Sequence, residues 1–473
     1  MCMSILDRSR SVARPGYSKW LIPPAALAVH LSIGQVYAFS VFKTSLVDHF
    51  GTSQTPVAAI FSIAIVMLGL SAAVLGTWVE REGPRKAMVA AALCWGIGFM
   101  VGSLGIATSQ LWLLYLGYGV IGGIGLGIGY ISPVSTLMKW FPDRPGLATG
   151  MAIMGFGGGA LIASPLSNKL LGTFDSGFDG KTGSVADGHA LTMTFLVLGV
   201  AYLVFMLFGA SLIRVPPEST DAAGTKTPAG QMTGRNGAMV RASEAIRTKQ
   251  FWLLWVVLFC NVTAGIGILE QAAPMIQDFF RDGKTSTVTA AAAGGFVGVL
   301  SLANMAGRFV WSSTSDLIGR KPIYMIYLGV GIVTYLLLAT VGHTSTGLFV
   351  LLAAVILSFY GGGFATIPAY LKDLFGTLEV GAIHGRLLTA WSAAGVAGPL
   401  IVNGFLDAAG KPGSLTNGDY RPALFTMVGV LVVGFVANLL VTDVSRDHFD
   451  AGATSDSAPD ARASDTVDEG ALR

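Results

Sequence analysis

The sequence predicts an all-α membrane protein with twelve membrane-spanning helices, arranged as two halves of six. Only 12% of its 473 residues are charged, against about 25% in ordinary soluble domains, and its mean hydropathy is +0.64. Apolar stretches of about 20 residues or more recur along the chain, each long enough to cross a ~30 Å hydrocarbon core as a helix. A long polar segment separates the sixth stretch from the seventh.

The twelve apolar stretches follow one another with short connections. They cover residues 20–42, 55–79, 86–108, 111–137, 145–171, 191–213, 251–279, 288–311, 322–341, 346–371, 382–406 and 423–441. The first stretch follows a basic tail, as in a signal peptide. Its apolar part is too long for a signal peptide and no small-residue cleavage site follows, so we expect it to stay in the mature protein.

The positions of the cations predict that both termini are cytoplasmic. With that orientation, the tails and even-numbered connections hold 22 Lys and Arg residues, the odd-numbered connections hold 7, and Arg308 remains within a span. An excess of cations on the cytoplasmic side is the positive-inside pattern. We therefore expect a multi-pass protein of the cell inner (plasma) membrane, surrounded by the lipid bilayer.

The same patterns define five regions of the chain. We expect a cytoplasmic tail at 1–19, a six-helix half at 20–214, a cytoplasmic linker at 215–249, a second six-helix half at 250–442 and a C-terminal tail at 443–473. The linker is rich in Gly, Thr and Ala. The C-terminal tail has almost no large apolar residues, which predicts that it is disordered.

The two halves carry similar short loops at matching places, after the second and the eighth span. The first reads GTWVEREGPRK from Gly76 and the second SSTSDLIGRK from Ser312. In each, an acid is followed three residues later by a glycine and then by bases. Glycine permits the tight turn, and the charges can pair with helix ends. Although an ordinary basic loop would fit one copy, the repetition favours cytoplasmic gating loops, formed by Gly76, Glu80, Gly83, Arg85, Asp316, Gly319 and Arg320.

These loops resemble the signature of the major facilitator superfamily, with Glu80 where that family usually has Asp and with Pro84 interrupting the usual Gly-Arg order. The segment GIGLGIGYISPVSTLMKWFPDRPGLATGMAIMGFGGGALI and the later DLFGTLEVGAIHGRLLTAWSAAGVAGP resemble the oxalate/formate antiporter family within it, which is related to the monocarboxylate transporters. The resemblance implies the major facilitator fold, two pseudo-symmetric six-helix bundles around a central cavity that opens alternately to each side. It also implies small carboxylates as substrates.

Glycine makes up 62 of the 473 residues and is concentrated in the fourth and fifth spans. No strand precedes these glycine runs and their surroundings are apolar, so a phosphate-binding loop is a poor match. Small residues let membrane helices approach closely. We expect close helix packing or a closely packed gate in these spans, and the sequence does not separate the two.

Arg308 is the candidate that determines the substrate class. A charge in mid-bilayer costs ~2.5–3.5 kcal/mol on insertion scales, and Arg308 lies eight residues before Asp316, about 12 Å along a helix. Its side chain spans about half that distance, so snorkelling to the surface, or a structural pair within the membrane, is the less favoured alternative. A guanidinium stays charged and holds a carboxylate with two parallel donors. In the resembling families, an arginine at this point of the eighth span binds the substrate carboxylate.

Two departures from those families narrow the substrate. Animal monocarboxylate transporters place an acid one turn before that arginine as part of proton coupling, and this chain has Asn304 there. Oxalate carriers have a lysine in a TAK stretch of the eleventh span, where this chain reads TAW with Trp391. One fixed cation instead of two matches a monoanion better.

Other side chains are candidates with open alternatives. His30 could couple transport to protons or be a neutral, hydrogen-bonded core histidine. Glu270 could carry a proton, pair with Arg308 or line the outer vestibule. Tyr37, Tyr130, Tyr360 and Trp391 could bind the substrate or serve packing. His384 is expected to be structural.

The function predicted is secondary active transport of small carboxylates by alternating access, with a monocarboxylate such as pyruvate, lactate or formate favoured. A proton or a counter-anion would be the coupled species. No Walker-type loop, metal-ligand cluster or nucleophile elbow is found in the sequence, so we expect no enzyme activity, no cofactor and no metal. We expect a monomer without nucleic-acid partners. A dicarboxylate antiporter of the oxalate/formate type and a non-transporting carboxylate sensor remain the alternatives.

Overall fold

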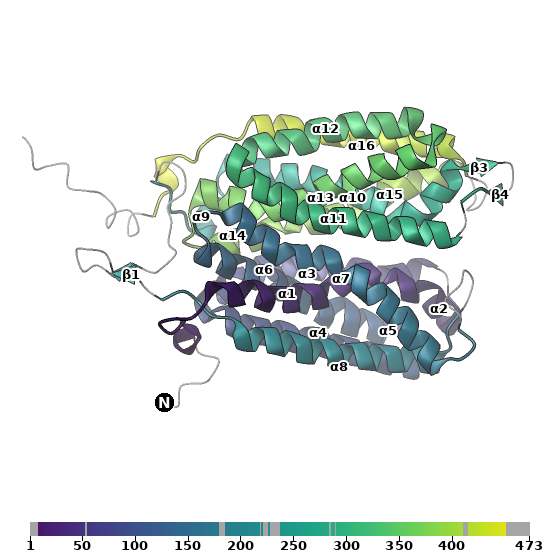
Figure 1. The fold of residues 1–473 in the computed structure, drawn as a ribbon, viewed down its shortest axis with the longest axis horizontal. Helices are drawn as coiled ribbons and strands as arrows, with labels where there is room; N and C mark the ends of the chain where they lie inside the picture. The colour runs from purple at the N-terminus through teal and green to yellow at the C-terminus, as the bar shows by residue number, and fades with distance from the viewer. Residues whose placement is uncertain are drawn as a thin grey trace, which may run out of the picture.

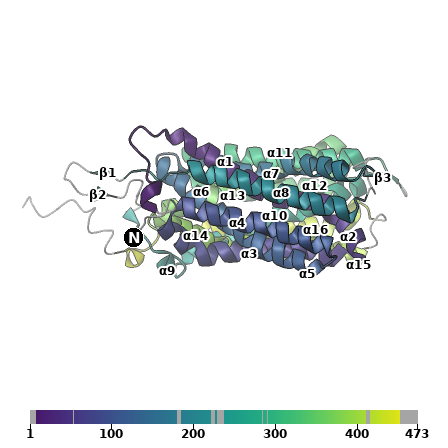
Figure 2. The ribbon, with the colours of Figure 1, turned by 90° about the horizontal axis from the view of Figure 1, so that it is seen from below.

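The computed structural model describes residues 8–52, 54–178, 185–217, 219–220, 226–227, 237–282, 285–288, 290–409 and 415–450. Its helices run along the long axis of the molecule in two groups, α1–α8 and α10–α16 (Figure 1). The purple start and the yellow end of the described chain lie at the same end of the molecule, which we call the termini end, and the strand β3 (Arg281–Asp282) lies at the opposite, far end (Figures 1 and 2).

The first half contains six passes along the long axis. The first pass is α1 (Ile22–Ile33), a 3-10 helix (Gly34–Ala38) and α2 (Ser40–Phe50). The second and third are α3 (Gln54–Glu82) and α4 (Pro84–Ala107). The fourth combines α5 (Leu111–Leu114), a π-helix (Tyr115–Gly122) and α6 (Gly123–Trp140). The fifth and sixth are α7 (Pro145–Phe174) and α8 (Gly188–Leu212).

The second half repeats this pattern. Its passes are α10 (Lys249–Phe279), α11 (Ala290–Ile318), α12 (Arg320–Val341), α13 (Thr346–Phe375), α14 (Val380–Leu387) continued by α15 (Thr389–Ala409), and α16 (Asn417–Leu439). Two antiparallel pairs of two-residue strands lie outside the passes, β1 (Ser219–Thr220) with β2 (Lys226–Thr227) and β3 (Arg281–Asp282) with β4 (Thr285–Ser286). A one-turn helix, α9 (Ala242–Ala245), precedes α10.

The expected all-α fold of twelve spans is confirmed. Eleven helical segments of the described chain are long and apolar enough to cross a membrane. The twelfth pass is α11, whose 29 residues are also long enough at 1.5 Å per residue. It carries two polar side chains near its middle, Asn304 and Arg308.

Three passes are not the continuous helices that the apolar stretches predict. The first is interrupted by the 3-10 helix at Gly34–Ala38, the fourth by the π-helix, and the eleventh at Leu388. Hydropathy reports whether a segment is apolar and is insensitive to its hydrogen-bond register. Such interruptions in helices are frequent at functional sites.

The first residues of the predicted C-terminal tail, 443–450, belong to the described part of the chain. Residues 443–450 include a 3-10 helix at Arg446–His448. The Asp450 amide donates to the Met239 carbonyl over 2.8 Å, and the Asp450 carboxylate pairs with Arg241. These contacts fix the segment against the linker although it has few apolar residues. Residues 451–473 lie outside the described part of the chain.

The two halves meet along α7, α11, α3, α14 and α15. In particular, α11 packs against α7 of the first half on one side and α13 of its own half on the other. The middle of α11 is therefore buried between the halves, and Arg308 is 0% exposed.

Candidate substrate site

Arg308 points into the protein interior and does not snorkel to the surface. Its Nε donates to Asn304 Oδ1 over 2.9 Å, and its Nη1 donates to the Ile153 carbonyl of α7 over 3.4 Å. Its Nη2 is buried and has no hydrogen-bond partner within 3.5 Å among the described residues. The guanidinium is thus oriented by two neutral acceptors from both halves, and one donor nitrogen remains free.

Two aromatic rings flank this guanidinium. Arg308 Cζ lies 5.6 Å from the ring centroid of Phe156 in α7 and 5.2 Å from that of Phe364 in α13. Ring faces attract a cation and offset part of the cost of burying it. Within the described residues, no carboxylate forms an ion pair with Arg308. Because a buried charge without a counter-charge costs several kcal/mol, the site favours the arrival of an anion.

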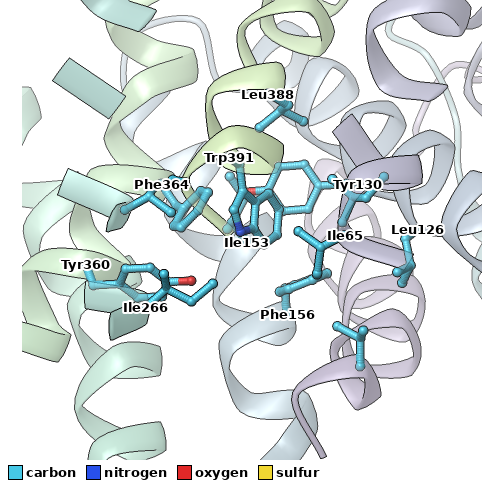
Figure 3. Packing of buried hydrophobic residues seen from close by; sticks show 14 of the residues in the cluster. Ile65, Leu126, Tyr130, Ile153, Phe156, Ile266, Tyr360, Phe364, Leu388 and Trp391 are labelled. Carbon is cyan, nitrogen blue, oxygen red and sulfur yellow. The ribbon is translucent and has the colours of Figure 1, made fainter. Parts of the chain in front are cut away.

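The rings around Arg308 belong to a larger group, which we call the aromatic cluster. Its six members are Tyr37, Tyr130, Phe156, Tyr360, Phe364 and Trp391. The indole of Trp391 is central: its ring centroid lies 4.4 Å from that of Phe364, 5.4 Å from Phe156 and 5.5 Å from Tyr130. Figure 3 shows Phe364, Trp391 and Tyr130 side by side across the boundary between the halves.

Three hydrogen-bond donors meet in this cluster without an acceptor. Besides Arg308 Nη2, the Tyr130 hydroxyl and the Trp391 Nε1 are buried and unpartnered. Leaving a buried polar group unpaired costs about 1–3 kcal/mol, and carboxylates accept hydrogen bonds without donating any. A small carboxylate therefore complements both the charge and the donors of the cluster.

Two other tyrosine hydroxyls join the halves directly. The hydroxyls of Tyr37 and Tyr360 are hydrogen-bonded at 3.1 Å, and the Tyr37 ring packs edge-on against Phe156 at 5.1 Å between centroids. Tyr360 lies one turn before Phe364 on α13, which begins at the far end. This bond therefore joins the halves on the far-end side of Phe364.

The space for Arg308 depends on a glycine of α7. A Cβ atom added at Gly157 would lie 2.9 Å from Arg308 Nε and 3.1 Å from its Cδ. The glycine run of the fifth span thus includes a position where a side chain would displace the guanidinium.

His30 lies beside the aromatic cluster and has two partners. Its Nδ1 faces the Ala152 carbonyl of α7, and its Nε2 is 3.1 Å from the Tyr130 carbonyl of α6. A neutral imidazole donates to only one of two such acceptors, whereas an imidazolium donates to both. The geometry accommodates a proton at His30.

Glu270 lies apart from Arg308. It is exposed on α10, toward the far end, and accepts a hydrogen bond from Asn403 Nδ2 over 3.3 Å. Of its expected roles, pairing with Arg308 is not what the structure shows, since Arg308 is held by Asn304 and Ile153.

The two repeated loops close the termini end with equivalent contacts between the halves. Asp316 accepts from the amides of Gly146 and Leu147, both over 2.8 Å, at the start of α7. Glu80 accepts from the amide of Gly381 over 3.1 Å at the start of α14. Each half thus places a carboxylate at the positive end of a helix of the other half.

The bases of the two loops are used differently. Arg320 pairs with Asp316 at 2.5 Å, whereas Glu80 pairs with Lys139 of α6 at 2.7 Å. Arg85 instead donates to the Ile213 carbonyl at the end of α8, as Lys321 does to the Leu439 carbonyl at the end of α16.

Pro84 explains this shift in register, because it occupies the position of Arg320 and moves the first arginine along by one residue. The loop glycines are equivalent, since Gly83 and Gly319 both have φ of +91°, a conformation that favours glycine. Gly76 packs against Ala382 of α14.

Sequence reasoning missed several residues of the site. Phe156, Phe364, Gly157 and Lys139 were not singled out. The sequence carries one signal, because Phe156 opens an FGGG run in the fifth span and Phe364 closes a GGGF run in the tenth. Arg308, Tyr37, Tyr130, Tyr360 and Trp391, which were named from the sequence, lie together in and around the cluster.

The profile of the Major Facilitator Superfamily matches residues 25–399 and, in a second match, 286–464. The chain belongs to this superfamily of membrane transporters. It is similar to an uncharacterized MFS-type transporter of Escherichia coli K12, YhjX, with 26% identity over 78% of this chain and 83% of the relative. It is similar to the oxalate:formate antiporter of Oxalobacter formigenes, with 25% identity over 79% and 81%. It also matches the apicoplast pyruvate carrier 1 of Toxoplasma gondii, with 26% identity over 57% and 55%.

Solved structures show the same fold. The Escherichia coli fucose:proton symporter FucP superposes with a TM-score of 0.65, at 14% identity over 90% of this chain and 100% of that chain. A bacterial homologue of the iron transporter ferroportin, in an outward-facing state, superposes with a TM-score of 0.61, at 15% identity over 89% and 98%.

Proposed function

We propose that this chain is a secondary active transporter of small monocarboxylates, such as pyruvate, lactate or formate, that works by alternating access. The observation that carries the proposal is Arg308, a fully buried guanidinium that has no counter-ion among the described residues and lies beside two further donors without a partner there. An oxalate:formate antiporter and a pyruvate carrier among the relatives support small carboxylates as the substrate class.

In the proposed binding mode, the carboxylate lies against Arg308 Nη2 and receives hydrogen bonds from the Tyr130 hydroxyl and the Trp391 indole. Phe156 and Phe364 keep the guanidinium in place and exclude water, which strengthens its attraction for the anion. Asn304 fixes the Nε without neutralising the charge. One guanidinium in the cluster favours a single negative charge on the substrate.

Alternating access follows from the contacts between the halves. We place the termini end in the cytoplasm, as the cation distribution indicates. Separation of Asp316 from α7 and of Glu80 from α14 opens the cytoplasmic side, and breakage of the Tyr37–Tyr360 bond opens the outer side. The substrate binds at the boundary, where either opening exposes it.

For the coupled species we propose His30 as the best-placed proton site, because protonation lets it donate to both of its carbonyl partners. Exchange against a second anion is the other mode of coupling. An imposed pH gradient distinguishes them: it drives accumulation in a symporter and leaves a pure exchanger unaffected.

Flux through purified protein in liposomes tests the proposal. Labelled pyruvate, lactate, formate and oxalate are offered one at a time, and a monocarboxylate should be transported in preference to oxalate. Preference for oxalate would favour the dicarboxylate antiporter instead. Binding of a carboxylate without movement across the membrane would identify a sensor.

A further inference from the structure

His384 of α14 is a buried histidine with no hydrogen-bond partner. It is 0% exposed, and neither its Nδ1 nor its Nε2 has a partner in the part of the chain that the structure describes. Its ring centroid lies 5.8 Å from that of Tyr130. Since the large majority of buried side-chain polar atoms are hydrogen-bonded, two bare nitrogens on one ring need an explanation.

The position of His384 lies between the aromatic cluster and the closed termini end. On one side it contacts Tyr130, a member of the cluster. One turn earlier on the same helix, the Gly381 amide donates to Glu80 and so holds α14 against the first half. His384 therefore lies on the boundary between a member of the cluster and the Gly381–Glu80 contact.

The helix that carries His384 is built as a separate segment. α14 ends at Leu387, and α15 begins at Thr389, with Trp391 in its first turn. His384 therefore lies on the segment that Glu80 contacts through Gly381, and Trp391 lies on the next segment. His384 is three residues from Gly381, whereas Trp391 is ten residues away.

Nearby charged groups do not use the imidazole. Glu80 is engaged by Gly381 and by Lys139. His30, which also contacts Tyr130, has two carbonyl partners of its own. Every protonation state of histidine carries at least one N–H, so His384 keeps a free donor in a region with no protein acceptor for it.

We propose that His384 is a second contact for the substrate carboxylate, occupied as the anion moves between Arg308 and the termini end. The inference rests on the proposed transport of small carboxylates, and it adds a residue that contacts the substrate only when one end of the protein is open. In this scheme, Arg308 holds the anion while both ends of the protein are closed, whichever side of the membrane the anion came from. His384 donates a hydrogen bond to the anion only when the termini end is open.

The test compares the two faces of the membrane. Right-side-out and inside-out vesicles are prepared with wild-type protein, H384F and H384Q, and sidedness is assigned by protease access to a C-terminal tag. The half-saturating concentration of the transported monocarboxylate is measured at each face. H343F, at an exposed histidine near the far end, is the matched control, and H384L replaces H384F if the latter does not fold.

The loss of one hydrogen bond to a charged group corresponds to a change of about tenfold in affinity, here at one face of the membrane only. We expect H384F to raise the half-saturating concentration about tenfold at the termini face and to leave the far face within about twofold. H384Q keeps an N–H donor and should restore most of the loss, and H343F should match wild type.

Equal values for H384F and wild type at both faces would overturn the role of His384 while leaving the transport function intact. Equal losses at both faces, or no recovery in H384Q, would likewise overturn it, because they describe a packing defect. If wild-type protein transports none of the carboxylates tested, the proposed function fails, and this assignment fails with it.

Discussion

Gly157→Ala is the mildest change that should displace Arg308. The new Cβ would lie 2.9 Å from Arg308 Nε, roughly 0.6 Å inside the lower end of ordinary contact distances, about 3.5 Å. Arg308 Nε also donates a hydrogen bond to Asn304 Oδ1 over 2.9 Å. A shift of the guanidinium by that amount stretches or breaks this bond and turns the free Nη2 away from its present direction.

The size of the effect follows from the interaction lost. Hydrogen bonds to charged groups contribute about 1.5–3 kcal/mol, and each 1.4 kcal/mol is about a tenfold change in affinity. We expect G157A to weaken binding of the transported carboxylate by about tenfold or more. The assay is competition by unlabelled carboxylate for uptake of the labelled one in proteoliposomes.

Gly158→Ala is the matched control. A Cβ at Gly158 would meet Met305 Sδ at 2.6 Å, and this flexible side chain can move aside at little cost. G158A should therefore bind the carboxylate nearly as wild type does. Equal losses in both variants would mean that helix packing is responsible, and unchanged affinity in G157A would refute the view that the present position of Arg308 is the binding position.

Three further changes test other parts of the proposal. N304D places a carboxylate beside Arg308 that competes with the substrate carboxylate when it is ionised. Uptake by N304D should be low at neutral pH and recover as the pH falls and the acid is protonated. Uptake by N304D that does not depend on pH would contradict this. W391K adds a second cation to the cluster and should shift preference from monocarboxylates toward oxalate; an unchanged substrate profile would place the residue outside the binding site. E80Q weakens the hydrogen bond to Gly381. The closure of the termini end is measured with a cysteine introduced at the buried Ser135, which packs against Gly381. If E80Q destabilises the closed state by about 1.4 kcal/mol, this cysteine should react about tenfold faster with an impermeant thiol reagent added at the termini face. Equal rates would show that Glu80 does not keep this end closed.

Much of the fold follows from composition, because a bilayer requires long apolar helices and Arg308 is conspicuous among them. The convergence of four aromatic residues was less predictable, namely Tyr37, Tyr130, Tyr360 and Trp391. The sequence of a membrane helix does not distinguish an aromatic residue that packs against other helices from one that binds a substrate. Phe156 and Phe364 have no polar side-chain atom, so nothing in their apolar spans marks them as site residues. Their role depends on where α7 and α13 meet α11, which no local pattern reports.

The asymmetry of the two repeated loops shows a similar limit. Both copies contain an acid, a glycine and bases, and the acids do occupy equivalent places at helix starts. The sequence did not indicate that Lys139, 59 residues from Glu80, would neutralise it. Nor did it indicate that Pro84 would shift Arg85 to the end of α8, as both contacts depend on tertiary packing.

The central claim is that Arg308 binds the carboxylate that is transported. Its most direct test is uptake of labelled pyruvate, lactate and formate by proteoliposomes containing wild type, R308A or R247A, where Arg247 is an exposed arginine paired with Glu244. Wild type and R247A should transport at least one of these anions at equal rates, and R308A, shown to be folded by its elution as a single species in detergent, should transport none. Uptake by R308A at the wild-type rate would contradict the claim.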